Sequence, residues 1–69
     1  MHQTLGEALP AEMARVRDEV MPAYAACGDV GAFALAQMRV ELDAAAKALS
    51  ERDMATAVRV YESLKGWHV

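Results

Sequence analysis

The chain has 69 residues, with 10 acidic against 7 basic side chains and a formal net charge of −3. This length allows one small domain, and the charges are interspersed without the basic stripe that nucleic-acid binding generally needs. No apolar run approaches the roughly 20 residues of a membrane span, so no membrane association is expected.

The composition predicts an all-α protein. Apolar residues make up 55% of the chain, 15 of them are alanine, and isoleucine is absent. Alanine, leucine, methionine, glutamate and arginine favour helices. A single cysteine, Cys27, excludes an internal disulfide, and no zinc-ligand spacing is present, so no metal and no cofactor is expected. A chain this short has a marginal core, and we expect a homodimer to complete it.

Residues 1–8 show no clear periodicity and are predicted to be flexible, ahead of a single helical domain over 9–69. The first helix is expected over about 9–27, because Pro10 suits a first helical turn. Its apolar stripe recurs at steps of three and four and consists of Leu9, Met13, Val16, Val20 and Tyr24. Pro22 lies within this pattern and predicts a kink or an early stop at Met21.

The segment CGDVG separates the first helix from the second. It lacks the lysine and the spacing of a phosphate-binding loop, and no predicted strand precedes it. We instead expect Gly28 to end the first helix in a left-handed conformation and Asp29 to cap the next helix. Cys27 is expected to be a buried or half-buried structural residue.

The second helix is predicted over about 30–51 and is apolar on two sides. The side expected to face the domain carries Leu35, Met38, Leu42, Ala45, Ala46 and Leu49. The nearly opposite side carries Phe33, Ala36, Val40 and Ala44. A helix that is apolar on both sides is usually packed between two partners, so these four residues are candidate interface residues. The acidic residues Glu41 and Asp43 are expected to form a solvated rim.

The third helix is predicted over about 53–65, with Asp53 as its N-cap and Gly66 as its stop. The short connection before Asp53 predicts that the second and third helices form an antiparallel hairpin. The apolar face of the third helix is expected to consist of Met54, Ala57, Val58, Tyr61 and Leu64. Trp67 either folds back over the hairpin or anchors a partner, and it joins the candidate interface.

Two resemblances follow from these segments. Residues 44–64, AAAKALSERDMATAVRVYESL, resemble part of a tetratricopeptide repeat, in which Ala57, Tyr61 and Leu64 match packing positions. Less than one repeat is covered, whereas solenoids need about three, so this resemblance implies only local hairpin packing. The stretches GAFALAQM (31–38), Leu-Asp (42–43) and YESLKG (61–66) resemble short phage- or prophage-encoded bacterial proteins of unknown function. That resemblance implies a bacterial cytoplasm and brings no catalytic residues.

These observations predict a small non-enzymatic protein that binds another protein, such as a host factor, through apolar helix faces. The alternative is a DNA-binding regulator in which the second and third helices form a helix-turn-helix, with Arg52 and Arg59 near phosphates. The acidic balance opposes it, and Met54 offers little base readout.

An enzyme would require a pocket in which Cys27, Tyr24 and a histidine meet. The N-terminal MHQTLGEALP lacks the order of a signal peptide, so the cytoplasm is the expected compartment.

Overall fold

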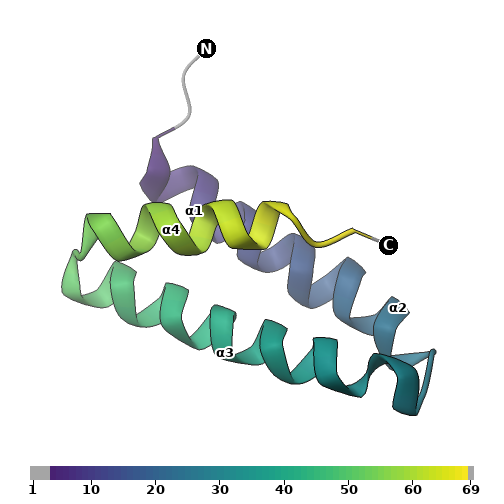
Figure 1. The fold of residues 1–69 in the computed structure, drawn as a ribbon. Helices are drawn as coiled ribbons and strands as arrows, with labels where there is room; N and C mark the ends of the chain where they lie inside the picture. The colour runs from purple at the N-terminus through teal and green to yellow at the C-terminus, as the bar shows by residue number, and fades with distance from the viewer. Residues whose placement is uncertain (1–3, 69) are drawn as a thin grey trace.

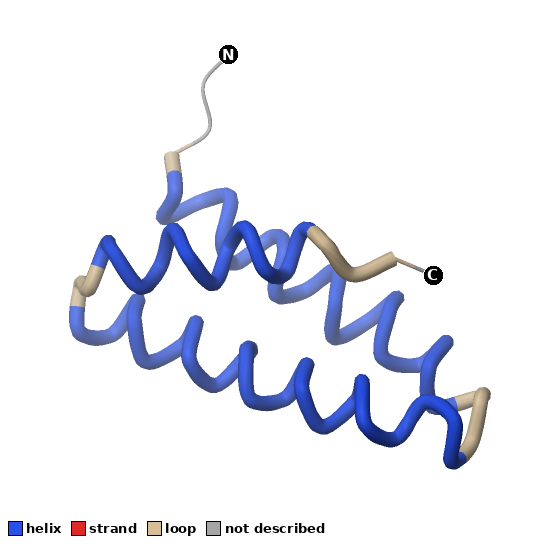
Figure 2. The backbone as a smooth tube through the Cα atoms, in the orientation of Figure 1, coloured by secondary structure: helices blue, strands red, loops and turns tan. Residues whose placement is uncertain are grey.

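The computed structural model describes residues 4–68, and within this range the chain is all-α, as its composition predicts. The first helical segment has three consecutive parts: α1 (Leu5–Arg15), a π-helical turn η1 (Val16–Val20) and α2 (Met21–Ala25). Two further helices follow, α3 (Asp29–Glu51) and α4 (Met54–Lys65). Short loops connect them (Figures 1 and 2).

The predicted antiparallel hairpin of α3 and α4 is confirmed: the two helices run side by side in opposite directions (Figure 1). The first helical segment lies diagonally against this hairpin, where α1 contacts α4 and α2 contacts α3. The molecule is thin, with extents of 35 × 25 × 15 Å. One side of α3 therefore faces the other helices, and its opposite side is left without a covering layer.

The core is built from all the helical segments. Its buried apolar members are Leu9, Val16, Val20, Met38, Ala45, Ala48, Ala57, Val60 and Leu64. On the predicted inner side of α3, Met38 and Ala45 are buried as expected. Ala46 is exposed, because it lies at the edge of that side. On α4 the buried stripe is Ala57, Val60 and Leu64, so it is rotated from the prediction and leaves Met54 and Val58 each 50% exposed.

The first helix begins at Leu5, four residues before the predicted start, because the apolar stripe extends further toward the N-terminus. Leu5 packs against the core, and Ala8 and Leu9 are buried. Pro10 is consequently inside α1 rather than in its first turn. Of the segment predicted to be flexible, residues 5–8 are helical, and residues 1–3 lie outside the described range.

Pro22 does not end the helix at Met21. The π-helical turn ends at Val20, directly before Met21, and the Met21 N–H donates to the carbonyl of Val16. The helix then continues to Ala25, two residues short of the predicted end. A wide turn of this kind re-satisfies backbone groups next to a proline, which lacks an N–H of its own. Val16 and Val20 both stay fully buried across the turn.

The corner between α2 and α3 depends on two glycines. Gly28 has a positive φ of 65°, as predicted, but its ψ of −136° is not that of a left-handed helical cap. Gly28 is the N-cap of α3, and Asp29, predicted to be the cap, is the first residue of the helix; no side chain caps this helix start. Gly31 is buried, and a Cβ atom there would collide with the backbone carbonyl of Tyr24. Only glycine allows the two helices to approach this closely.

The predicted cap of α4 is confirmed. Asp53 Oδ1 accepts a hydrogen bond from the Thr56 N–H (3.2 Å), and Oδ2 accepts one from the Thr56 hydroxyl (2.7 Å). Both bonds lower the pKa of Asp53, the hydroxyl bond more strongly. Gly66 ends the helix, although its φ of −74° is right-handed.

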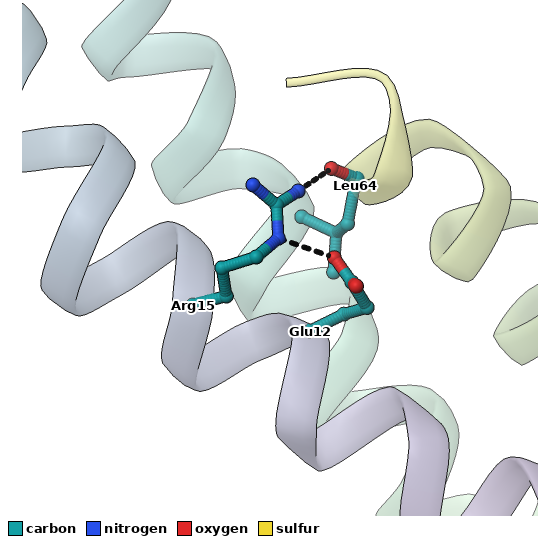
Figure 3. A network of polar contacts seen from close by, with 3 residues as sticks. All are labelled: Glu12, Arg15 and Leu64. Carbon is teal, nitrogen blue, oxygen red and sulfur yellow. Dashed lines mark hydrogen bonds and ion pairs between the residues drawn. The ribbon is translucent and has the colours of Figure 1, made fainter. Parts of the chain in front are cut away.

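Arg15 ties α1 to the end of α4 (Figure 3). Its Nη2 donates to the carbonyl oxygen of Leu64 at 3.1 Å, and its Nε forms an ion pair with Glu12 at 2.9 Å. Carbonyls in the last turn of a helix have no partner within the helix, and this carbonyl accepts hydrogen bonds both from Arg15 and from the Trp67 backbone N–H, the latter at 3.1 Å. The Arg15 contact also fixes the point from which the C-terminal tail departs.

Candidate functional site

Three of the predicted interface residues of α3 (Phe33, Ala36 and Val40) are exposed, on a side that no other helix within residues 4–68 covers, and the fourth, Ala44, packs at the border with the core. Phe33 is 83% exposed and Val40 is 61% exposed. Ala36 is exposed, and Ala44 is half-buried. Val30, which the prediction omitted, adds to this surface near the start of α3 and is 90% exposed. We call these five residues (Val30, Phe33, Ala36, Val40 and Ala44) the α3 outer face.

The outer face is presented on a firmly held helix. α3 is 23 residues long, and its inner side is anchored by Met38, Ala45 and Ala48, which are 0–2% exposed. Fully burying a large apolar side chain is worth about 1.5–3 kcal/mol. A partner that covers Phe33 and Val40 gains this free energy without ordering a flexible segment first.

A buried carboxylate joins α3 to the C-terminal end of α4. Glu41 is 9% exposed, which contradicts its predicted place on a solvated rim, whereas Asp43 is exposed as expected. Glu41 Oε1 accepts hydrogen bonds from the Ser63 hydroxyl (2.7 Å) and from the Trp67 Nε1–H (3.1 Å). Its Oε2 accepts a third bond from Gln37 Nε2 at 3.2 Å. Buried polar groups are stable when their hydrogen bonds are made, and these three bonds meet that requirement.

The tail after α4 folds back over the bundle. Besides its bond to Glu41, Trp67 packs edge-to-face on Tyr24, with ring centroids 6.0 Å apart and an interplanar angle of 85°. The Tyr24 hydroxyl donates to the backbone carbonyl of His68 at 3.1 Å. Of the two interpretations of Trp67, the structure favours the one in which it packs, since its ring is half-buried and its N–H is bonded.

The same tail closes a surface hollow of ≈ 180 Å³ that is lined by Ala23, Tyr24, Cys27 and His68. This hollow does bring together the cysteine, the tyrosine and a histidine. Cys27 is exposed rather than buried, because the chain turns at the surface between α2 and α3.

The hollow does not have the geometry of an activated thiol. Nucleophilic catalysis needs a base within hydrogen-bond reach of the nucleophile and a third group that orients the base. The Cys27 thiol instead donates to the carbonyl of Ala23 at 3.5 Å, and Tyr24 bonds the backbone of His68 rather than its imidazole.

A second hollow of ≈ 170 Å³ lies between α3 and α4, next to the outer face. Ala44, Lys47, Ala48 and Glu51 line it from α3, and Asp53 and Thr56 line it from α4. The four α3 positions are spaced i, i+3, i+4 and i+7, which is the arrangement that receives one side chain of a neighbouring helix in knobs-into-holes packing.

The described part of the chain contains neither a cluster of metal ligands nor a membrane-spanning helix. No three His, Cys, Asp or Glu side chains of residues 4–68 gather closely enough to hold a metal ion. Over the same residues, every helix is too short or too polar to cross a membrane.

Comparisons with protein-family models, with curated proteins and with solved structures find no match for this chain. The functional argument therefore rests on the chain's own surfaces.

The sequence located the outer face but missed Glu41 and Gly31. Glu41 lies three residues after Met38 and four before Ala45, so helical spacing alone places it beside the inner stripe. That spacing could have predicted the burial of Glu41. The partners Ser63 and Trp67 are 22 and 26 residues away along the chain, and no local pattern links them to Glu41.

Proposed function

We propose that this chain is a small non-enzymatic protein-interaction module that binds another protein through the α3 outer face. The observation that carries the proposal is the exposure of Phe33 and Val40, 83% and 61%, on a helix whose other side is fully packed. Large exposed apolar side chains that cluster on one face are typical of protein–protein contact sites. An aromatic side chain at the centre of such a face is also a common hot spot.

The resemblance of 31–38, 42–43 and 61–66 to short phage-encoded bacterial proteins supports a more specific proposal. In it, the chain is made in the bacterial cytoplasm and binds a host protein whose behaviour it modifies. The outer face then docks on an apolar groove or helix of that protein, which is the mode by which amphipathic helices bind partners.

The alternative, a DNA-binding regulator, finds less support. A helix-turn-helix joins its helices at about 90–120°, whereas α3 and α4 lie side by side along their length (Figure 1). The net charge of −3 also opposes DNA, since affinity for phosphates depends on clustered Lys and Arg.

A photo-crosslinking residue placed at position 33 tests the proposal in lysate of the native host. We expect a discrete crosslinked partner, which disappears when unlabelled wild-type protein competes and persists when unlabelled Phe33→Glu is added. A crosslinker at position 58 is the matched control, because Val58 is an exposed apolar residue of α4 outside the outer face. No crosslinked product at position 33, or the same products at both positions, would refute the proposal.

The exposed Cys27 provides a separate test against an enzymatic role. We expect its alkylation by iodoacetamide to be as slow as that of an unactivated thiol and to be unchanged in His68→Ala. Fast alkylation that depends on His68 would indicate an activated cysteine and would favour a thiol enzyme instead.

A further inference from the structure

The α3 outer face carries a charge pattern as well as an apolar one. Asp29 and Lys47 are 18 residues apart, which is five full turns of an α-helix, so they lie on the same side of α3 about 27 Å apart. Phe33, Ala36 and Val40 lie between them on that side. Both charged side chains are exposed, and neither forms an ion pair among residues 4–68.

This line has the three- and four-residue spacing of one face of a helix. From Asp29 the steps to Phe33, Ala36, Val40 and Ala44 are four, three, four and four residues. Asp29 and Lys47 carry opposite charges near the two ends of this line, with residue 38 midway between them, and the exposed acidic residues Asp43 and Glu51 also lie at the Lys47 end. A copy of the chain that runs in the opposite direction therefore sets each Asp29 beside a Lys47.

We propose that the partner of the α3 outer face is a second copy of this chain, packed as an antiparallel, two-fold symmetric α3–α3 pair centred on residue 38. This proposal rests on the interaction function proposed above, and it puts a second copy rather than a host protein on the outer face. Two-fold symmetry places Asp29 of each copy beside Lys47 of the other, which makes two equivalent ion pairs. It also places Ala36 opposite the partner's Val40, a small residue against a large one.

A parallel pair does not fit the same surface. It would set Asp29 against the partner's Asp29 and Lys47 against the partner's Lys47, and like charges at these positions repel. Parallel helices would also align their macrodipoles, whereas antiparallel helices oppose them favourably. The charge pattern thus selects the antiparallel arrangement.

The hollow between α3 and α4 supports the same register. Residue 30 of one copy lies opposite residue 46 of the other when the axis passes through residue 38. This brings the 90% exposed Val30 to the hollow lined by Ala44, Ala48 and neighbouring residues. The most exposed large apolar side chain of residues 4–68 is thereby matched with the hollow of ≈ 170 Å³.

Charge reversal at Asp29 and Lys47 tests this arrangement. Asp29→Lys makes both positions basic, and Lys47→Glu makes both positions acidic, so each variant alone replaces two attractive pairs by two repulsive ones. We expect each to weaken dimerisation by roughly tenfold in sedimentation velocity. An equimolar mixture should recover the wild-type sedimentation coefficient, because all the pairs are attractive in the mixed dimer. Lys65→Glu, the same charge change at an exposed position of α4, should leave dimerisation unchanged.

Spin labels measure the orientation directly. A nitroxide on a cysteine that replaces Glu51, with Cys27→Ser to remove the native thiol, lies 13 residues from the symmetry axis. Two labels in the antiparallel dimer should then be about 40 Å apart, against roughly 10–15 Å in a parallel pair. The antiparallel distance supports the proposal, and the short distance overturns it.

The outcomes separate this proposal from the broader one. A wild-type chain that sediments as a monomer throughout the micromolar range, or charge variants that both dimerise like wild type, would overturn the self-pairing. A host protein crosslinked through position 33 would leave the proposed interaction function standing in that case. If position 33 also crosslinks to nothing, both proposals fail.

Discussion

The two sides of α3 are both apolar, yet they have different surroundings. Met38 and Ala45 on the inner side are fully buried, whereas Phe33 and Val40 on the outer side are 83% and 61% exposed. The inner side is covered because α4 and the first helical segment both pack against it, and residues 4–68 form no further helix that covers the outer side. An apolar side of a helix therefore need not be buried within its own domain, and its residues alone do not tell which molecule would cover it.

The largest expected difference between the two sides is in folding stability. Met38→Ala should lower the free energy of unfolding by about 2–5 kcal/mol, because it leaves a cavity in a packed core. Phe33→Ala should change it by no more than about 0.5 kcal/mol in the monomer, since the ring has few contacts to lose. Urea unfolding at low protein concentration measures both. Equal losses for the two variants would show that Phe33 is a core residue.

Larger side chains should also destabilise the inner side of α3 more than its outer side. Gly31→Ala should destabilise the fold by about 1–3 kcal/mol, because its Cβ would meet the backbone carbonyl of Tyr24, which cannot move without shifting α2. Ala36→Leu adds three carbons to the exposed outer face and should leave the stability of the monomer, measured at low protein concentration, nearly unchanged. Thermal melts followed by circular dichroism distinguish them. A stable Gly31→Ala variant would contradict the close approach of α2 and α3.

The Glu41 cluster lies at the border of the two sides and offers a smaller effect. Glu41→Ala should cost about 1–3 kcal/mol, because it leaves the Ser63 hydroxyl and the Trp67 N–H without their acceptor. Trp67 is the chain's single tryptophan, so its fluorescence should shift toward that of a solvated indole as the tail detaches. Glu41→Gln keeps an acceptor oxygen and should retain most of the wild-type spectrum. Identical spectra for Glu41→Ala and wild type would show that the tail is held without this contact.

The sequence located both sides of α3 because three- and four-residue spacing is a local property. It placed Glu41 wrongly because a charged residue was assigned to solvent without weighing its position between Met38 and Ala45. The donors that make its burial tolerable come from the end of α4 and from the tail, so only the tertiary fold supplies them. Local rules predict a kink or an early stop at Met21, and they do not say which; the structure has a π-helical turn over Val16–Val20, and the helix continues past Pro22.

The smallest predicted effect concerns the exposed cap of α4. Hydrogen bonds from Thr56 lower the pKa of Asp53 in the folded state. A lowered folded-state pKa contributes stability that is present above the unfolded pKa of about 3.9 and is lost as the pH falls through the folded value. Asp53→Asn does not titrate, so its stability should fall less than that of wild type between about pH 5 and pH 2.

Urea midpoints measured across that range test the cap. The pKa of Asp18 is also lowered, by its hydrogen bond with Arg17, but this contribution is present in both proteins and cancels in the comparison. Parallel pH profiles for wild type and Asp53→Asn would show that the Asp53 carboxylate does not stabilise the helix start.

Sedimentation velocity on three proteins at the same micromolar concentration tests most directly whether a second copy covers the outer face of α3. Wild type and Val58→Glu should both sediment as dimers, because Val58 lies outside the outer face, and Phe33→Glu should sediment as a folded monomer. A monomeric wild type, or a Phe33→Glu variant that dimerises like wild type, would contradict self-pairing through the outer face.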